Sequence, residues 1–261
     1  MLDNEKFLAL MEEQNELLRV QNGILRSEMN KNNIFQLGLG VPPQPDTLYI
    51  DRVQGEDYLW YRLTGPDNDI KVPIYDTAIT GIIKDIRFKS QRFESKGGTK
   101  YSSKVIVRFD CDRQFFVRTT VGSVAFISFL QALSVVKETY LLRAVCLELE
   151  PSSDPKKPTA VFCHLWDAES GIVYDPPSSG SWDGVDWNSL INEGIHKIKN
   201  ANGLKIPSRE EMTLVSDDLI QRLGIDGQAY LRESWGYKSR SQLNDGEYES
   251  FIESLEALLQ R

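Results

Sequence analysis

The sequence predicts a mostly β protein with added helices: a five-stranded barrel over residues 77–166, an N-terminal coiled-coil-type helix and a small C-terminal helical module. Three observations predict this class. Residues 77–166 show the pattern of three strands, a helix and two more strands. The first 32 residues repeat apolar side chains every seven positions, as coiled coils do. From Ser208 onwards, short amphipathic segments follow capping residues, which is typical of packed helices.

The central strands are predicted from β-branched and aromatic runs at 80–88, 103–109 and 114–119. A helix follows over 123–137, where apolar residues recur at helical spacing, and then strands over 140–150 and 159–166. Residues 89–100 are polar and basic with Gly97 and Gly98 at the tip, so we expect a loop there. Three strands, a helix and two strands is the order of a partly open five-stranded barrel.

In order and character, residues 77–166 resemble the OB-fold single-stranded nucleic-acid-binding proteins. The resemblance covers about a third of the chain. It implies that the helix closes the bottom of a barrel. It also implies that the loop joining the first two strands borders a groove for single-stranded nucleic acid.

The charge distribution also points to this region. Residues 77–121 hold ten Lys and Arg and four Asp and Glu, a net charge of +6, although the whole chain carries −8. A basic stretch on an acidic protein indicates a local polyanion site, and interleaved aromatic rings suit base stacking. Because strands alternate faces, only part of the set shares one surface. The candidate nucleic-acid contacts are Lys84, Arg87, Lys89, Arg92, Phe93, Lys100, Tyr101, Lys104, Arg108, Phe116 and Arg118, with Trp166 a weaker candidate.

Residues 1–32 are predicted to form an oligomerisation helix, whose apolar stripe suits packing against copies of itself. The alternative is a helix docked on the chain's own body. We favour self-association because the segment is terminal and a Pro- and Gly-rich linker, 33–46, follows it. The stripe consists of Phe7, Leu10, Met11, Leu17, Leu18, Ile24 and Leu25, with the polar Gln14 and Gln21 at its edge.

A β domain over 47–185 is expected to hold the barrel and, before it, short strands at 48–53, 58–63 and 70–75. Tyr58, Trp60 and Tyr61 suit either base stacking or the core, and we favour the core.

The C-terminal module, 186–261, is acidic, which favours docking a protein over binding phosphate. Its connector 236–243 resembles that before the last helix of some phage-type recombination and strand-annealing proteins. Expected helix caps are Asp186, Ser208 with Glu211, Ser216, Asp226, and Asn244 with Glu247.

No catalytic signature is present in the sequence: the P-loop, dinucleotide, zinc-protease and nucleophile-elbow patterns are all missing. Cys111, Cys146 and Cys163 are widely spaced, so we expect no metal site. Because the catalytic patterns are missing too, we expect no cofactor and no enzyme. Asp110 and Asp112 are interpreted as turn carboxylates rather than cation ligands. No apolar run approaches the roughly 18–20 residues that span a bilayer, and no secretory signal is evident. We therefore expect a cytoplasmic, nucleoid-associated protein without membrane contact.

Together these patterns predict a non-catalytic, oligomeric protein that binds single-stranded DNA or RNA in DNA replication, recombination or repair. The alternative is an oligomeric scaffold or adaptor, in which the barrel and the helical tail bind protein partners. Exposure of Phe93, Tyr101 and Phe116 beside the cations distinguishes the two functions.

Overall fold

The computed structural model describes residues 46–64, 68–95, 97–176, 184–237 and 239–260. These residues belong to one compact unit, Pro45–Arg261. The predicted oligomerisation helix, 1–32, and all of the linker except Asp46 lie outside the described residues. Self-association through that helix therefore stays a prediction, as does the division into domains.

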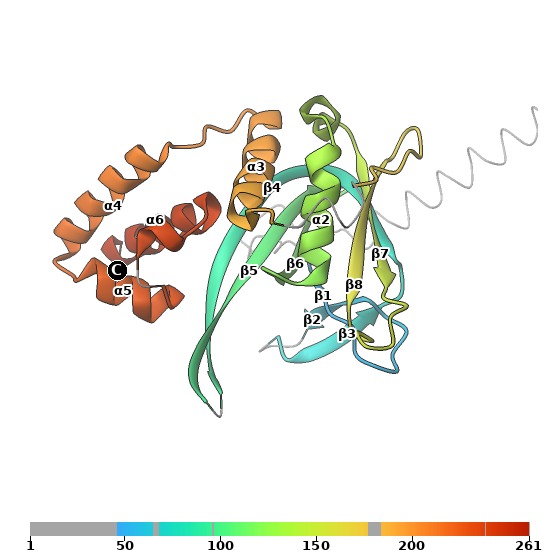
Figure 1. Cartoon of the computed structure of the whole chain (residues 1–261), viewed down its shortest axis with the longest axis horizontal. Coiled ribbons are helices and arrows are strands. Elements are labelled where there is room, and N and C mark those ends of the chain that lie inside the picture. Colours follow the sequence, from blue (N-terminus) through green and yellow to red (C-terminus); the bar gives the residue numbers. More distant parts are fainter. Residues whose placement is uncertain (1–45, 65–67, 96, 177–183, 238, 261) are drawn as a thin grey trace, which may run out of the picture. The chain divides into compact units, whose positions relative to one another are not determined.

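An eight-stranded sheet organises the described residues (Figure 1). Its strands run in the order β3-β2-β1-β6-β5-β4-β7-β8, and every neighbouring pair is antiparallel except β1 with β6. In chain order the strands are β1 (Asp46–Ile50), β2 (Trp60–Thr64), β3 (Ile70–Ile74), β4 (Ala78–Ser95), β5 (Gly98–Asp110), β6 (Gln114–Thr120), β7 (Val145–Pro151) and β8 (Val161–Asp167).

The predicted five-stranded OB-like barrel is wrong. The expected order of strands and helix does occur, because β4, β5, β6, α2 (Val124–Val135), β7 and β8 come in that order. The strand predicted over 140–150 begins only at Val145, because a 3-10 helix, Glu138–Leu142, precedes it. Closing these five strands into a barrel requires the outer two, β6 and β8, to pair. Instead β6 pairs with β1, with Leu48 opposite Val117 and Tyr49 opposite Arg118. Because β1 takes the hydrogen-bonding edge of β6, the sheet stays open, with β3 and β8 as its edges.

The loop predicted over residues 89–100 is also wrong. β4 continues to Ser95 and β5 begins at Gly98, and Lys89 pairs with Lys104 and Phe93 with Lys100. Polar composition predicted a loop, but a two-stranded ribbon that extends beyond the core buries little of its surface and can be mostly polar. Gly98 has a φ of 102°, a conformation that favours glycine in a tight turn.

An extra residue in β4 changes which side chains face the core. Ile79 and Ile83 are buried before it, and Ile86 and Phe88 after it, so buried positions change from odd to even. The register with β5 shifts between Ile83 and Asp85, which marks a β-bulge. After the bulge, the odd-numbered side chains of β4 point away from the core.

Helix α2 packs against β8 and carries much of the core. Ser123 caps its start by accepting a hydrogen bond from the Phe126 amide. Ser128 on its buried face accepts a hydrogen bond from the Cys163 amide at 2.8 Å, which joins the helix to β8. Helix α3 (Trp187–Ala201) begins at the predicted cap Asp186 and contacts α2 and β4.

The C-terminal helices are α4 (Arg209–Leu223), α5 (Gly227–Trp235) and α6 (Asp245–Leu259). The predicted capping boxes Ser208–Glu211 and Asn244–Glu247 are confirmed, and Asp226 caps α5. The helix start predicted at Ser216 is wrong. Ser216 lies inside α4, fully buried, with its hydroxyl 3.1 Å from the Tyr248 hydroxyl. A buried partner therefore satisfies a side chain that sequence alone suggests as a cap.

Close glycine contacts attach these helices to the sheet. A Cβ on Gly246 of α6 would lie 2.4 Å from the Phe88 ring of β4, so no other residue allows this approach. Figure 1 shows α4–α6 on one side of the β4–β5 hairpin and β1–β3 on the other. Within the described ranges, no helix is both long and apolar enough to cross a membrane.

Candidate functional site

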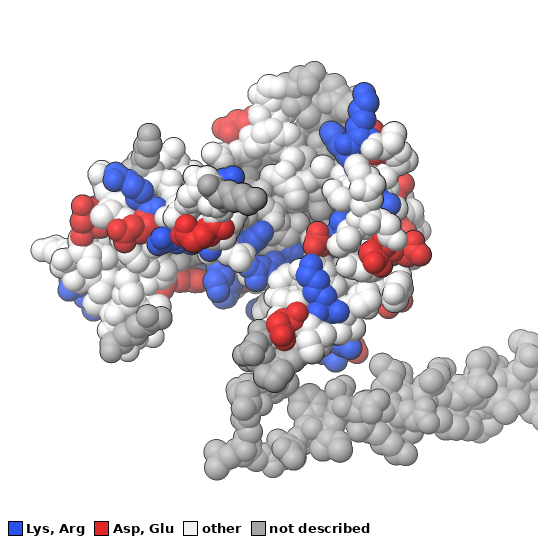
Figure 2. All heavy atoms as spheres, turned by 90° about the horizontal axis from the view of Figure 1, so that it is seen from below, with Lys and Arg blue, Asp and Glu red and all other residues white. Residues whose placement is uncertain are grey.

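The sheet face turned away from the core gathers most of the candidate cations. On β4 and β5, Lys89 stands opposite Lys104, and Phe93 opposite Lys100. On β6, Arg118 stands opposite Ile106 of β5. Viewed from below, Lys and Arg side chains gather in the hollow between the α4–α6 helices and β1–β3 (Figure 2). We call this surface the basic face; it comprises Arg87, Lys89, Phe93, Lys100, Lys104, Arg108, Phe116 and Arg118.

Carboxylates neutralise some of the predicted cations and leave others free. Arg87 pairs with Asp85 at 2.8 Å, Arg92 with Glu94 at 3.3 Å, and Arg108 with Asp110 at 3.7 Å. Four cations of the basic face make no ion pair with any residue in the described part of the chain: Lys89, Lys100, Lys104 and Arg118. These four supply the uncompensated positive field that an approaching polyanion meets.

Four predicted contacts, counting the weaker candidate Trp166, lie elsewhere. Arg92 and Tyr101 face each other on the opposite side of the hairpin, where Tyr101 packs against α5. Lys84 is the extra residue of the β-bulge and is half-buried. Trp166 lies on β8, which β4 and β7 separate from β5 in the sheet. None of the four belongs to the basic face.

The candidate aromatic residues differ in access. Phe93 is 43 % exposed and stands across from Lys100, so its ring is free to stack on a base. Phe116 is half-buried between Arg108 of β5 and Thr47 of β1. Phe93 is therefore the main stacking candidate of the original set.

The same face carries an aromatic ladder of which the sequence indicated only one member: Tyr61 was weighed for base stacking but assigned to the core, and Tyr49 was missed. Tyr49 of β1 stacks on Tyr61 of β2, with ring centroids 5.2 Å apart and planes 11° from parallel. The Arg118 guanidinium lies 5.4 Å from the Tyr49 centroid, and the Lys71 ammonium 4.3 Å from that of Tyr61. Each tyrosine follows a buried residue in its strand, so alternation places both side chains on the face turned away from the core. The pairing of β1 with β6 has no local signal.

A cavity of about 400 Å³ lies beside this ladder. We call it the Lys104 cavity; its polar lining includes Tyr49, Tyr61, Gln91, Lys104, Arg118 and Thr120. The Lys104 ammonium donates to the Thr120 hydroxyl at 2.7 Å, and the Arg118 guanidinium donates to the Gln91 side-chain oxygen at 3.3 Å. Burial, and then the charge of Arg118, lower the pKa of Lys104. Neutral hydrogen bonds thus position both cations while their charges stay uncompensated.

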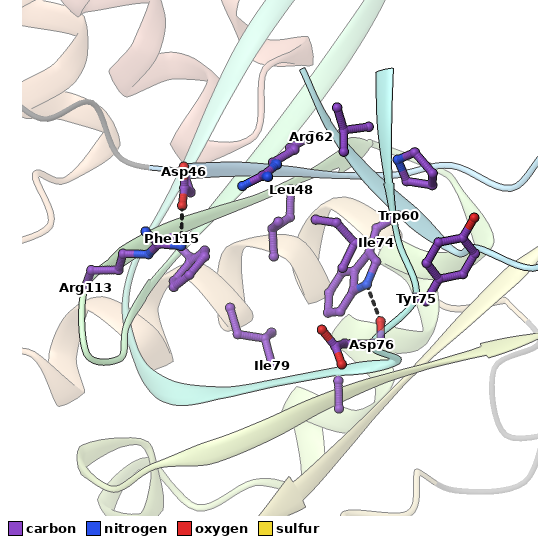
Figure 3. Close-up of a pocket in the computed structure, with 13 residues that line it drawn as sticks. Asp46, Leu48, Trp60, Arg62, Ile74, Tyr75, Asp76, Ile79, Arg113 and Phe115 are labelled. Carbon is purple, nitrogen blue, oxygen red and sulfur yellow. Dashed lines mark hydrogen bonds and ion pairs between the residues drawn. The ribbon is translucent and has the colours of Figure 1, made fainter. Parts of the chain in front are cut away.

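A second cavity, of about 510 Å³, opens on the opposite face between β1–β3 and the start of β4. Figure 3 shows its apolar floor of Leu48, Trp60 and Ile79. At its rim Arg113 pairs with Asp46 at 2.7 Å, and the Trp60 indole donates to the Asp76 carbonyl. The apolar floor and the neutralised Arg113 suit a polyanion poorly. Arg62 also lines this cavity and is its one cation without an ion pair among the described residues, whereas the basic face has four, so the basic face is the stronger candidate.

Among the described residues, no group of three or more His, Cys, Asp or Glu side chains is placed to hold a metal ion. Asp110, one of the two turn carboxylates, pairs with Arg108.

Comparisons with protein-family models, curated proteins and solved structures gave no match. The function is therefore inferred from the chain's own residues.

Proposed function

We propose that this chain is a non-catalytic, oligomeric protein that binds single-stranded DNA or RNA, in the cytoplasm at the nucleoid, during DNA replication, recombination or repair. One observation carries the proposal: Lys89, Lys100, Lys104 and Arg118 lack carboxylate partners among the described residues and share one face with the exposed Phe93. Unpaired cations attract phosphates and release their counterions, and an exposed ring stacks on a base of any sequence.

Acidic side chains border one side of this face. A crevice lined by Arg87, Lys89 and Glu253 lies between β4 and α6. The hydrogen bond that Arg87 donates to the Asp85 carboxylate is the main cause of the raised pKa of Arg87, and the charges of Glu253 and Glu249 add to it. These carboxylates repel a polyanion near Arg87. We therefore place the strand from Phe93 and Lys100, past Lys89, toward Lys104 and Arg118.

A titration of fluorescent oligonucleotides at two salt concentrations tests the proposal. We expect binding that weakens steeply with salt, and a Lys89→Gln, Lys100→Gln double variant whose log–log salt slope is shallower by about 1.4, because each lost phosphate contact removes about 0.7 for a single strand. Arg92→Gln is the matched control: it removes one charge from the same hairpin, on the opposite face, where Arg92 pairs with Glu94. Undetectable or salt-independent binding would refute the proposal.

The adaptor function remains the second candidate because α4 exposes apolar side chains. Leu214 is 66 % exposed and Val215 43 %. Tyr101 contacts α5 and is therefore not free to stack on a base, which agrees with the adaptor function. The exposure of Phe93 favours the nucleic-acid binder. If α4 only docks a protein, Leu214→Ser with Val215→Ser leaves oligonucleotide affinity unchanged. A loss of strand binding in this variant would instead assign α4 to the nucleic-acid site.

The oligomer is tested separately, by the solution mass of the full chain and of a chain lacking Met1–Asn32. We expect only the full chain to self-associate, because the heptad stripe lies within the deleted residues. Equal oligomeric states would place self-association elsewhere.

A further inference from the structure

The Lys104 cavity holds more positive charge than its surroundings neutralise. Lys104 and Arg118 both line it from neighbouring strands, and neither pairs with a carboxylate in the described ranges. Asp51 also lines the cavity, but its carboxylate pairs with Lys71 at 3.4 Å. Two like charges in a partly buried cavity repel each other, and a bound anion removes that cost.

The ladder beside the cavity is unavailable for base stacking. Tyr49 has Tyr61 on one face and Arg118 on the other, while Tyr61 has Tyr49 on one face and Lys71 on the other. With both faces of each ring covered, a base can enter only by displacing a cation. Chiefly through burial, the pKa of Tyr61 is raised, so its hydroxyl stays protonated at neutral pH and can donate a hydrogen bond. The cavity therefore presents donors and cations, and the ladder holds Arg118 in place.

The chemistry of the lining selects the kind of anion. A backbone phosphodiester carries one negative charge, whereas a phosphate monoester carries about −1.5 to −2 at neutral pH because its second pKa is about 6. Two uncompensated cations match the dianion, and charge-assisted hydrogen bonds to its oxygens are the strong ones. The volume of about 400 Å³ falls in the range of small-molecule sites, roughly 300–1,000 Å³.

We infer that the Lys104 cavity is a phosphate-monoester site. This inference rests on the proposed function in one respect: in a strand-binding protein, the monoester is the terminal phosphate of a single strand. The same chemistry is offered by a free mononucleotide, so the experiment separates the two sources. The charged and titratable groups facing the phosphate are Lys104, Arg118, Tyr49, Tyr61, Asp51 and, beyond Tyr61, Lys71.

The test compares the full-length chain's affinity for one oligonucleotide carrying a 5′-phosphate, a 3′-phosphate or only hydroxyl ends. Nucleoside monophosphate and inorganic phosphate serve as further ligands. We expect one phosphorylated end to bind about ten- to hundredfold more tightly than the hydroxyl end, the range of one charge-assisted hydrogen bond. The preference should shrink from about pH 7.5 to about pH 5.5, as the monoester loses its second charge near its pKa of about 6. The hydroxyl-ended strand should show no such change.

Lys104→Gln and Arg118→Gln should each abolish the end preference. Arg92→Gln is the control, because it removes one charge from the same hairpin on the opposite face and Arg92 does not line the cavity. Lys89→Gln should weaken binding of every strand alike and keep the end preference, because Lys89 stands opposite Lys104 but does not line the cavity. Thermal unfolding of each variant checks the fold, and Arg118→Lys, which keeps the charge, should retain part of the preference. Where a glutamine variant unfolds, the pH dependence of the native chain's end preference still shows whether the chain recognises the second charge of the monoester.

The outcomes separate the inference from the proposed function. Strand binding without an end preference, or a preference that survives both substitutions, overturns the inference and leaves the function standing. Binding of the mononucleotide through Lys104 and Arg118, with no strand binding, overturns the function and supports the inference. If the chain binds neither the strand nor the mononucleotide, both the inference and the proposed function are overturned.

Discussion

The Tyr101 hydroxyl donates a hydrogen bond to the Glu233 carbonyl oxygen at 2.9 Å. The same ring lies against Gly236, the residue that ends α5. Tyr101 therefore joins β5 to the end of α5. Although Phe93 lies near it in the hairpin, Phe93 faces the other side.

This difference predicts opposite effects for two aromatic substitutions. Tyr101→Phe should lower the free energy of unfolding by about 1 kcal/mol, the net value of one hydrogen bond, and leave oligonucleotide affinity unchanged. Phe93→Ala should weaken oligonucleotide binding about five- to hundredfold, through the loss of one stacked base, and leave stability nearly unchanged. Chemical denaturation and fluorescence titration measure the two quantities. Weaker strand binding by Tyr101→Phe at unchanged stability would place Tyr101 in the site.

Gly236 should be far less tolerant of substitution than another glycine in the same conformation. Its φ is 74°, and a Cβ there would lie 2.5 Å from the Tyr101 ring. We expect Gly236→Ala to lower the free energy of unfolding by about 2–4 kcal/mol, from left-handed strain of about 1–2 kcal/mol plus the cost of overpacking. Gly224→Ala is the control, because Gly224 has a φ of 63° with nothing within 4 Å of its Cβ position. Equal losses in the two variants would mean that the contact with Tyr101 costs nothing.

Removing an acidic neighbour of the basic face should strengthen nucleic-acid binding. Glu253 lines the crevice with Arg87 and Lys89. Glu253→Gln should raise affinity about two- to threefold at low salt, the scale of one partly screened charge, and the gain should fade as salt increases. Glu256→Gln, on the same helix and exposed, does not line that crevice and should have a smaller effect. A gain that persists at high salt would have a cause other than charge.

The raised pKa of Tyr237 predicts how the free energy of unfolding changes at alkaline pH. Its hydroxyl donates to a Glu247 carboxylate oxygen at 3.3 Å, and burial, then the charge of Glu247, raise the pKa of Tyr237 from 10.0 to about 12. Because the folded pKa exceeds the unfolded value, the stabilisation is fully present below pH 10.0 and is lost as the pH rises through about 12.

We therefore expect the free energy of unfolding to fall less steeply between about pH 10 and pH 12 in Tyr237→Phe than in the native chain. Chemical denaturation across this range measures the difference. Tyr174, whose pKa is also raised to about 12, adds a slope of its own that Tyr237→Phe leaves in place. Identical slopes in the two proteins would show that the pKa of Tyr237 is the same in the folded and the unfolded state.

Local signals in the sequence predicted the capped helix starts except the one at Ser216, and predicted the candidate site only in part. Ser208 with Glu211, and Asn244 with Glu247, sit where predicted, because a capping box satisfies backbone amides within four residues. The cations Lys89 and Lys104 were predicted, but Arg92 and Tyr101 lie on the opposite face. The β-bulge near Lys84 sets that division, and no composition rule locates it. Tyr49 was missed because its neighbour Arg118 lies far away in the chain.

By itself, the sequence determined the order of strands and helices between residues 77 and 166, the caps of the C-terminal helices and the excess of positive charge in one stretch. Each depends on neighbours within a few positions, where spacing and propensity act. Only the tertiary structure decided that β1 pairs with the free edge of β6 and leaves the sheet open. That pairing also assembles Tyr49, Tyr61, Lys104 and Arg118 around one cavity. The reason is physical: hydrogen bonds between distant strands depend on which edges meet in space, and a single strand's pattern does not encode its partner.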